Sequence, residues 1–515
     1  MEQKPSRLIV LFGLCAAALI PLMLFRDPTV SNELRYLSIA DEALRDGHIF
    51  AFYNHGVAYA DKPPLYLWLI IAGRLLFGCH SMLWLSLLSL VPAFITVAVL
   101  DRWCAPVMSR SHRIAAAAAL ISTLYFTACS VVVRMDMLMI MFITLALYTF
   151  FRMYEGDGRL RLRIAFPLYV FLAVFSKGAV GILVPLLCIP AFLLLKKQLR
   201  TLGRYWGWMT WGILLLLCGA WFFMAYREGG ADYLRNLLFH QTVDRAVNAF
   251  WHKAPFYFYL LHFWYILFPW CLLAAGTIAI ALFRRQDMDD RSRFMSCSAI
   301  VIIVMLSLIS SKLDIYLLPA IGLIVYATFL LLPALKADKF VKYSLLVPLV
   351  CLAAALPVAA IILRKPDSGA GFASLLSPWT ILPLEIGTVA ALAALSRGKL
   401  KLLTCAFAAG MYLTLFVSGL QIKQLNPYIG YRALCEEAVE TAAAEGITRF
   451  VLATDADGVP LLDRGENIDV YLGTAVEMLP LSVIEELACS PDTAEKIIVF
   501  TETDKKPTFA VYGQQ

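Results

Sequence analysis

Charged side chains occupy the short turns between long apolar runs, where a charge facing lipid is costly unless it is paired or reaches water. The turn between the apolar runs 114–133 and 137–151 carries Arg134 and Asp136, and the turn after 164–176 carries Lys177. The turn before 315–335 carries Lys312. Basic side chains can hold a phosphate, and carboxylates can activate a hydroxyl or stabilise a developing positive charge. These turns therefore predict a reaction site.

Longer polar segments, and the start of the run 315–335, add residues that could belong to the same site. They are Asn32, Glu33, Arg35, Tyr36, Asp61, Lys62, His240, Arg245 and Tyr316. Any one of these charges could simply anchor a helix end in lipid headgroups. Nearby tyrosines and tryptophans suit a sugar face and a membrane interface equally, so they do not decide between the two. Because all of these groups are predicted to lie on one side of the membrane, a shared reaction site is favoured over separate headgroup anchors.

Composition indicates which elements must hold these residues. Of 515 residues, 61% are hydrophobic and only 16% are charged. This excludes an ordinary soluble, disordered or coiled-coil chain. Thirteen apolar runs are candidate membrane helices. They are 8–25, 81–100, 114–133, 137–151, 164–176, 179–195, 205–226, 254–283, 294–311, 315–335, 343–363, 378–396 and 402–420.

The distribution of basic residues predicts the orientation of the chain. If Lys4 and Arg7 are cytoplasmic, alternation places six loops rich in Lys and Arg inside, as the positive-inside rule requires. These loops are 101–113, 152–163, 196–204, 284–293, 336–342 and 397–401. The first outer loop, 26–80, and the large outer loop, 227–253, then lie outside. Within the first outer loop, Glu33–Asp46 and Pro63–Gly78 are expected to be interfacial helices.

The tail after residue 420 differs in character, because residues 421–515 contain 7 Lys/Arg and 16 Asp/Glu. Helices are expected at Tyr431–Glu445 and Leu479–Ala488. Strands are expected at Arg449–Ala453, Asp469–Leu472, Lys496–Thr501 and Thr508–Tyr512. We therefore predict a membrane domain over 1–420 and a small extracytoplasmic α/β domain over 421–515. Cys435 and Cys489 could pair there in an oxidising compartment.

Several motifs resemble those of one enzyme family. The motifs are Asn32-Glu33-Leu34-Arg35-Tyr36, Tyr59-Ala60-Asp61-Lys62-Pro63-Pro64, Arg134-Met135-Asp136, Phe175-Ser176-Lys177-Gly178, His240 to Arg245, and Lys312-Leu313-Asp314-Ile315-Tyr316. In this order they resemble the polyprenyl-phosphate-sugar glycosyltransferases. These integral-membrane GT-C enzymes include the aminoarabinose transferase of lipid A modification and the protein mannosyltransferases. The thirteen runs and the outer tail are most similar to the aminoarabinose branch.

The resemblance implies a reaction and a location. A sugar carried on an undecaprenyl-like phosphate would move to a lipid, glycan or protein acceptor on the outer face of the plasma (inner) membrane, with the lipid phosphate as leaving group. Lys62, Arg245, Lys312 and Tyr316 would bind the donor phosphate, and Glu33 and Asp136 would be catalytic. Asn32, Arg35, Tyr36, Asp61, Arg134, Lys177 and His240 would line the pocket.

This chain departs from the family at one position, because Asn32 stands where the family usually has aspartate. Asparagine cannot accept a proton, so Glu33 or Asp136 would have to serve if a base is needed. An ionised phosphate acceptor needs no base, whereas a hydroxyl acceptor does. The identity of the sugar and of the acceptor therefore stays open.

Two further questions stay open at this stage. The sequence requires no cofactor and leaves a divalent metal undecided, together with the oligomeric state. The alternative function is a transporter or flippase of a lipid-linked or anionic solute. That class places charges near the bilayer midplane and often carries internal repeats. Here the charges lie at one interface and no repeat is found in the sequence.

Overall fold

The computed structural model describes residues 8–238, 253–283, 288–335, 338–363, 378–489, 496–503 and 506–512. These residues form two compact units. The first unit contains 1–20, 60–66 and 86–418, and the second contains 21–59, 67–85 and 419–515. The boundary therefore passes through helices α1, α3, α4 and α18.

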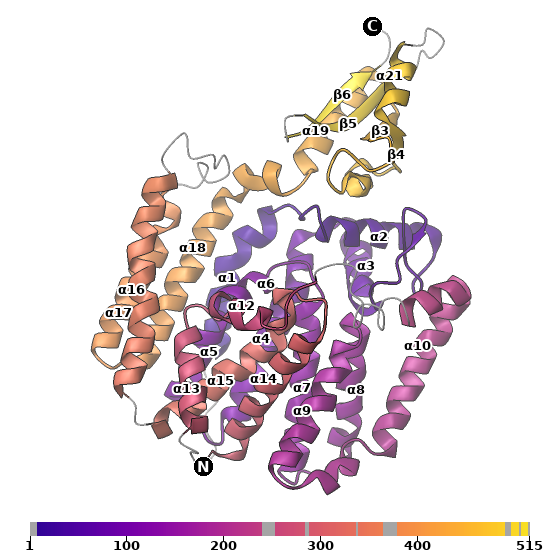
Figure 1. Cartoon of the computed structure of the whole chain (residues 1–515). Helices are drawn as coiled ribbons and strands as arrows, with labels where there is room; N and C mark the ends of the chain where they lie inside the picture. Colours follow the sequence, from indigo (N-terminus) through magenta and orange to yellow (C-terminus); the bar gives the residue numbers. More distant parts are fainter. Residues whose placement is uncertain are drawn as a thin grey trace. The chain divides into compact units, whose positions relative to one another are not determined.

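The first part of the chain is almost entirely helical (Figure 1). Its helices are α1 (Leu8–Phe25), α2 (Glu33–Asp46), α3 (Leu65–Phe77), α4 (Met82–Cys104), α5 (Arg110–Ile121), α6 (Leu124–Cys129), α7 (Asp136–Tyr154), α8 (Leu160–Lys177), α9 (Val180–Leu195) and α10 (Trp208–Arg235). The helices that follow are α12 (Phe258–Ile266), α13 (Cys271–Phe283), α14 (Asp290–Leu308), α15 (Leu318–Leu335), α16 (Asp338–Leu363), α17 (Leu382–Ser396) and α18 (Leu400–Ile429). Short 3₁₀ turns are η1 (Leu199–Arg204), η3 (Asp314–Leu317) and η5 (Pro378–Thr380).

Eight helices among the described residues are long and apolar enough to cross a membrane, and shorter apolar helices accompany them. The chain is a multi-pass membrane protein with a mostly helical fold, as predicted. Each predicted run coincides with a helix or a pair of helices. The count of thirteen spans stays a prediction, because several of these helices are short.

Two predicted runs are each broken in the middle. The run 114–133 forms α5 and α6, separated by Ser122 and Thr123, whose hydroxyls donate to carbonyls of the preceding turn. The run 254–283 forms α12 and α13, separated around Pro269, which lacks the N–H that a continuous helix needs. The two breaks are joined, since the Leu124 N–H donates to the Phe268 carbonyl at 3.1 Å. Backbone groups freed by breaking a helix in lipid are thereby satisfied within the protein.

The core of the first unit contains a cluster of aromatic rings from α4, α7, α9 and α14. The rings of Phe192 and Phe294 meet edge to face with centroids 5.0 Å apart, and Phe151 and Trp103 lie against Phe294. Helices α7, α8 and α9 lie side by side (Figure 1). Large buried rings supply much of the packing energy of such a core.

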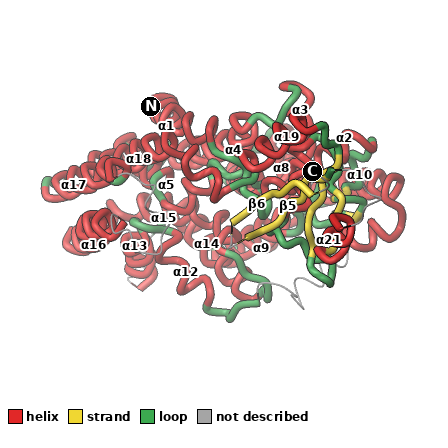
Figure 2. Tube along the Cα trace, turned by 90° about the horizontal axis from the view of Figure 1, so that it is seen from above, coloured by secondary structure: helices red, strands yellow, loops and turns green. Residues whose placement is uncertain are grey.

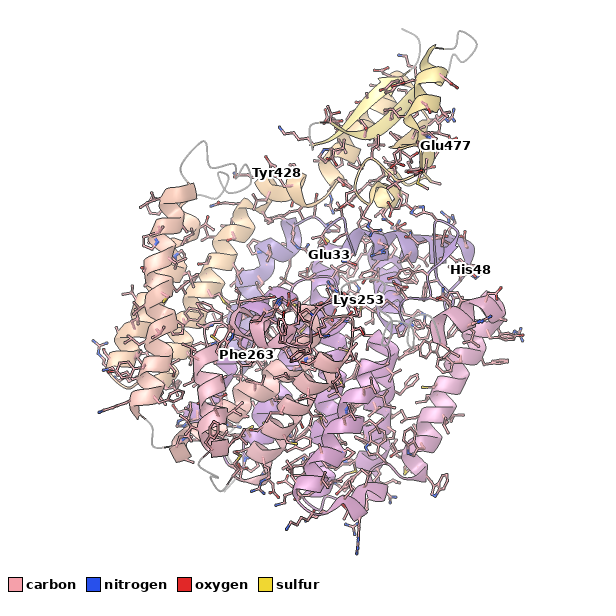
Figure 3. All side chains as sticks on the ribbon, viewed as in Figure 1. Glu33, His48, Lys253, Phe263, Tyr428 and Glu477 are labelled. Carbon is pink, nitrogen blue, oxygen red and sulfur yellow. The ribbon has the colours of Figure 1, made fainter. Side chains whose placement is uncertain are left out.

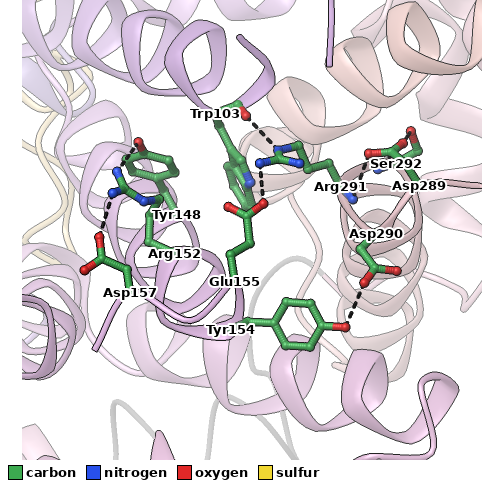
Figure 4. Close-up of polar contacts among 10 residues, drawn as sticks. All are labelled: Trp103, Tyr148, Arg152, Tyr154, Glu155, Asp157, Asp289, Asp290, Arg291 and Ser292. Carbon is green, nitrogen blue, oxygen red and sulfur yellow. Dashed lines mark hydrogen bonds and ion pairs between the residues drawn. The ribbon is translucent and has the colours of Figure 1, made fainter. Parts of the chain in front are cut away.

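Ion pairs connect the helices at the C-terminal end of α7 (Figure 4). Arg291 of α14 pairs with Glu155 and donates to the Trp103 carbonyl at 3.1 Å. Asp290 accepts from Tyr154 at 2.8 Å and from Lys196 at 2.7 Å. The residues that meet here belong to four of the basic loops predicted to be cytoplasmic, which are 101–113, 152–163, 196–204 and 284–293.

The second unit contains the C-terminal α/β region. Its elements are α19 (Arg432–Glu445), β3 (Arg449–Thr454), η6 (Gly465–Ile468), α20 (Asp469–Leu472), β4 (Glu477–Pro480), α21 (Leu481–Cys489), β5 (Ile497–Thr503) and β6 (Lys506–Tyr512). The strand order is β4-β3-β5-β6, with β3 parallel to β4 and β5, and β6 antiparallel to β5. Figure 2 shows β5 and β6 side by side.

One predicted strand of this region is wrong. Asp469–Leu472 forms a helical turn, which ends at Gly473 with φ +68°. Glycine adopts this left-handed conformation without a steric penalty, so it is a common residue at a helix end. Val470 and Tyr471 favoured a strand because valine and tyrosine are common in strands. The strand is instead the next segment, Glu477–Pro480. Cys435 is completely buried and is a free thiol, and the side chain of Cys489 lies outside the described residues.

The second unit also contains most of the first outer loop. Leu34 of α2 is fully buried in one hydrophobic cluster with Tyr431, Cys435 and Leu452. Ser38 of α2 donates to the Asp469 carboxylate at 3.0 Å. The first outer loop and the tail therefore share a core, although nearly 400 residues separate them along the chain.

A small hairpin completes the loop. Strands β1 (Tyr53–Asn54) and β2 (Val57–Ala58) are joined by His55 and Gly56, both with positive φ, as a tight hairpin turn requires. The backbone N–H groups of these two turn residues donate to the Glu42 carboxylate at 2.6 and 2.9 Å. The hairpin is thereby fixed to α2.

A prediction concerns Asp469 in this unit. Burial raises the pKa of Asp469 above its usual value, although His55 and the Ser38 hydroxyl oppose the rise. A carboxyl with a raised pKa in the folded state contributes most stability when protonated, and this contribution falls as the pH rises from the unfolded value through the folded value. We expect Asp469→Asn to raise the free energy of unfolding at pH 7 by about 1 kcal/mol, because a buried charge is removed. Thermal unfolding at pH 5 and pH 7 measures this, and equal or lower stability of the variant at pH 7 would contradict it.

Candidate active site

Asp136, Lys177 and Arg134 form an ion cluster in the first unit. Asp136 begins α7 and is 1% exposed, and Lys177 ends α8 and is paired with it. The Arg134 Nε atom lies 3.4 Å from the second carboxylate oxygen. The N-terminus of a helix favours a carboxylate, so the start of α7 is a favourable position for Asp136.

The turns that carry this cluster are fixed by their own residues. Ser89 of α4 donates to the carbonyls of Val132 and Arg134, at 2.6 and 3.2 Å. After Lys177, α8 stops at Gly178, which has φ +101°. Since this conformation is strained for other residues, Gly178 lets the chain reverse directly after the lysine.

Tyr316 extends the cluster. The Lys177 ammonium lies 4.8 Å from the centroid of the Tyr316 ring, within the range of a cation–π contact. Tyr316 belongs to η3, so this contact brings a third predicted site segment against the ends of α7 and α8. The structure therefore brings together four of the predicted residues, Arg134, Asp136, Lys177 and Tyr316.

Lys312 lies in the loop before η3 and is only 4% exposed. Its ammonium donates to the carbonyls of Ile309 and Ala254, at 2.5 and 3.1 Å. Burial lowers the pKa of Lys312 below the usual lysine value. A lysine ammonium has three donors, so one more can face an anion. Lys253, labelled in Figure 3, pairs with Ser311 through a backbone bridge that ties the segment before α12 to this loop.

Asp61 and Lys62 belong to the same unit and lie in the turn before α3, where both are half-buried. Pro63 and Pro64 follow them, and proline suits the start of a helix because its fixed φ matches and no N–H is lost. His240 and Arg245 lie outside the described residues, so the structure does not address these two predictions.

Glu33, labelled in Figure 3, lies in the second unit and is completely buried. Arg26 binds its two carboxylate oxygens at 2.6 and 2.9 Å, and the Thr29 N–H donates to the carboxylate at 2.6 Å. A bidentate arginine pair of this kind fixes geometry strongly. Its contacts thus give Glu33 a structural role at the start of α2.

The other first-loop residues surround the start of α2. Arg35 donates to the Asn32 side-chain oxygen at 3.1 Å and stacks over Tyr59, with 5.9 Å from its guanidinium carbon to the ring centroid. Tyr36 is buried, with 2% exposure. Asn32, Arg35 and Tyr36 thus lie in the second unit with Glu33.

Sequence reasoning missed two features. Arg26 follows the first apolar run directly and lies seven residues before Glu33, so a pair across the loop could have been suspected. His262 of α12 faces the Asp314 carboxylate of η3. No spacing in the sequence indicates this second contact, because 52 residues separate the two side chains.

Among the described residues, no group of three or more His, Cys, Asp or Glu side chains is placed to hold a metal ion. The local chemistry of the first unit is instead that of an anion site beside a carboxylate. Buried and partly buried cations lie next to Asp136 and Tyr316, which is a suitable setting for a phosphate ester.

Comparisons with known proteins show which proteins this chain resembles. The family described as dolichyl-phosphate-mannose-protein mannosyltransferase matches residues 61–223. The undecaprenyl phosphate-alpha-4-amino-4-deoxy-L-arabinose arabinosyl transferase of Pseudomonas savastanoi is 26% identical over 340 residues, which cover 65% of this chain and 61% of that protein. The enzyme of the same name from Erwinia tasmaniensis is 25% identical over 61% of this chain and 58% of that protein. The chain thus spans about three fifths of the length of these curated relatives.

The solved structures extend the likeness to the whole chain. The crystal structure of ArnT from Cupriavidus metallidurans bound to undecaprenyl phosphate matches with a TM-score of 0.79 and 17% identity, over 98% of this chain and 99% of that one. The fold is therefore that of the membrane-embedded GT-C glycosyltransferases. Within that class, the sequence and structure matches confirm the predicted resemblance to a GT-C glycosyltransferase family of the aminoarabinose transferase type.

Proposed function

We propose that this chain transfers a sugar from a polyprenyl-phosphate donor to a lipid, glycan or protein acceptor at the outer face of the plasma (inner) membrane. The activity is most like that of the aminoarabinose-type transferases. The observation that carries the proposal is the cluster of Asp136, Lys177, Arg134 and Tyr316 in a chain that shares the fold of ArnT.

The proposed chemistry follows from the charges. A polyprenyl chain stays in the bilayer, and its phosphate lies at headgroup level. Lys62, Arg245, Lys312 and Tyr316 bind this phosphate and neutralise the charge that it gains as the bond to the sugar breaks. Asp136 stabilises the positive charge that develops on the sugar. Asp61 lines this pocket, and the pocket roles of Asn32, Glu33, Arg35, Tyr36 and His240 stay predictions from the sequence.

The proposed topology places the N-terminus in the cytoplasm and residues 421–515 outside it. It is supported by the contacts at the C-terminal end of α7, where residues of basic loops predicted to be cytoplasmic meet one another. The cluster of Asp136 and Lys177 lies at the opposite end of α7. Protease treatment of intact spheroplasts tests this proposal, because an external tail is cleaved and an internal tail is protected.

The function is tested with the full chain in nanodiscs and undecaprenyl phosphate-4-amino-4-deoxy-L-arabinose as donor probe. Mass spectrometry of envelope lipids and glycans, with and without the gene, identifies the natural sugar and acceptor. Donor consumption that depends on the protein and changed envelope glycolipids support the proposal. Movement of the intact donor across a vesicle bilayer, with no bond broken, would instead indicate a flippase.

A prediction for Lys62 follows. Lys62→Ala should raise the KM for the donor about tenfold or more and lower kcat as well, because the cation contacts the phosphate of the bound donor and neutralises the charge that it gains in the transition state. Steady-state transfer rates at varied donor concentration measure this effect. Lys399→Ala, in a predicted cytoplasmic loop, is the matched control and should leave the KM unchanged. An unaltered KM in the Lys62 variant would remove this residue from the donor site.

A further inference from the structure

His262 and Asp314 form a side-chain pair whose two members come from different segments. The His262 Nδ1 atom contacts an Asp314 oxygen, and the Tyr265 hydroxyl lies 3.1 Å from the same nitrogen. The Phe258 ring lies against the imidazole, with centroids 3.7 Å apart. The side chains of His262 and Asp314 are 31% and 29% exposed. The imidazole is therefore held in position while remaining accessible.

The pair lies beside the proposed active site. Asp314 begins η3, the same short helix that carries Tyr316, and the Tyr316 ring contacts the Lys177 ammonium. Tyr259 of α12 donates to the Leu313 carbonyl at 3.2 Å, which fastens α12 to this loop. The bond from Leu124 to Phe268 fixes the other end of α12.

The carboxylates expected to act as bases are occupied in the structure. Asp136 is paired with Lys177 and Arg134, and Glu33 is enclosed by Arg26. Asn32 cannot accept a proton. With its Nδ1–H donated to Asp314, His262 presents a basic Nε2 atom, which is the arrangement of a general base. A phosphate acceptor needs no general base, because its oxygen is already ionised, whereas a hydroxyl acceptor must lose a proton.

We propose that His262 is the general base of the transfer, that Asp314 is its positioning residue, and that the acceptor group is a hydroxyl. This inference rests on the proposed function. The acceptor oxygen bonds to the anomeric carbon while His262 Nε2 takes the hydroxyl proton. The bond from the anomeric carbon to the phosphate oxygen breaks, and polyprenyl phosphate leaves with the electron pair. The imidazolium then releases its proton to water.

The experiment uses the full chain in nanodiscs with labelled undecaprenyl phosphate-4-amino-4-deoxy-L-arabinose. The acceptor is the envelope fraction of the source organism, untreated or treated with phosphatase. We expect His262→Gln to lower transfer about a hundredfold, within the usual contribution of a general base. Binding of undecaprenyl phosphate, measured by thermal shift, should stay unchanged. His112→Gln, in a predicted cytoplasmic loop, is the matched control and should transfer at the wild-type rate.

Two further readouts separate a catalytic role from a structural one. Asp314→Asn should lower the transfer rate less than His262→Gln does, because it loosens the position of the imidazole without removing it. The other polar groups in this setting are Tyr265 of α12 and Tyr125 of α6, whose surroundings include Asp314 and Arg134. Added imidazole should restore part of the activity of His262→Ala.

The outcomes are distinct. A product that is stable to mild acid and forms equally on phosphatase-treated acceptor supports the proposal. Wild-type transfer by His262→Gln, or an acid-labile glycosyl phosphate that is lost after phosphatase treatment, overturns it while leaving the proposed function intact. If the wild type neither binds undecaprenyl phosphate nor consumes the donor, the proposed function itself fails, and this inference fails with it.

Discussion

Asp136→Asn is expected to lower sugar transfer by about a hundredfold or more, measured on the folded fraction of the protein. The substitution keeps the shape of the side chain but removes its charge. Lys177 and Arg134 then face a neutral amide, and the site loses the carboxylate that stabilises positive charge on the sugar. Single-turnover transfer from the labelled donor measures the effect, with undecaprenyl phosphate binding as a parallel readout.

Asp290→Asn is the matched control for this experiment. Asp290 is also a helix-end carboxylate. It accepts from Tyr154 (Figure 4) and from Lys196, and Tyr154 ends α7, the helix that Asp136 begins. We expect its variant to keep activity within about twofold, because surface ion pairs contribute little. Wild-type transfer by Asp136→Asn, or an equal loss in both variants, would argue against a catalytic role for Asp136.

The second large effect concerns the buried pair of Arg26 and Glu33. Arg26→Met leaves the Glu33 carboxylate buried without its partner, and such a loss typically costs about 3–5 kcal/mol. We expect a large fall in the thermal stability of the purified chain and, with it, a loss of activity. Glu33→Gln should behave similarly, because Arg26 then faces a neutral amide in place of the carboxylate that it binds through two hydrogen bonds.

The double variant Arg26→Met with Glu33→Leu distinguishes a structural role of Glu33 from a role in the reaction. Replacing a buried ion pair with apolar side chains of similar size is often neutral, so stability should recover. If Glu33 only positions the loop, transfer recovers as well. A stable but inactive double variant would show instead that Glu33 takes part in the reaction, and the structural role assigned from its contacts would then be incomplete.

The sequence predicted the helical membrane fold and the C-terminal region well, for a physical reason. Lipid requires every backbone group to be satisfied within a helix, so a long apolar run leaves few alternatives. The breaks at Ser122 and Pro269 were missed, because the length of the apolar runs outweighed these local residues, and the hydrogen bond that joins the two breaks links distant segments. The strand expected at Asp469–Leu472 failed because residue type was weighed without the glycine that follows it.

Prediction of the candidate site was uneven for a similar reason. Charges confined to short turns have few positions open to them, so the sequence alone was enough to group Arg134, Asp136 and Lys177. The partners of Glu33 and His262 depend on how loops fold back, as the contacts with Arg26 and Asp314 illustrate. Whether a loop carboxylate such as Glu33 is accessible depends on its burial. A loop sequence has no regular hydrophobic periodicity from which burial could be predicted.

The shared core of Leu34 with Tyr431 and Cys435 has a consequence for biosynthesis. Leu34 emerges from the ribosome early, but the residues that cover it are made almost 400 positions later. At about 5–20 residues per second, this delay is roughly 20–80 s. During that time the first loop has its apolar face uncovered, so chaperones and quality-control proteases of its compartment have their best opportunity to act on the nascent chain.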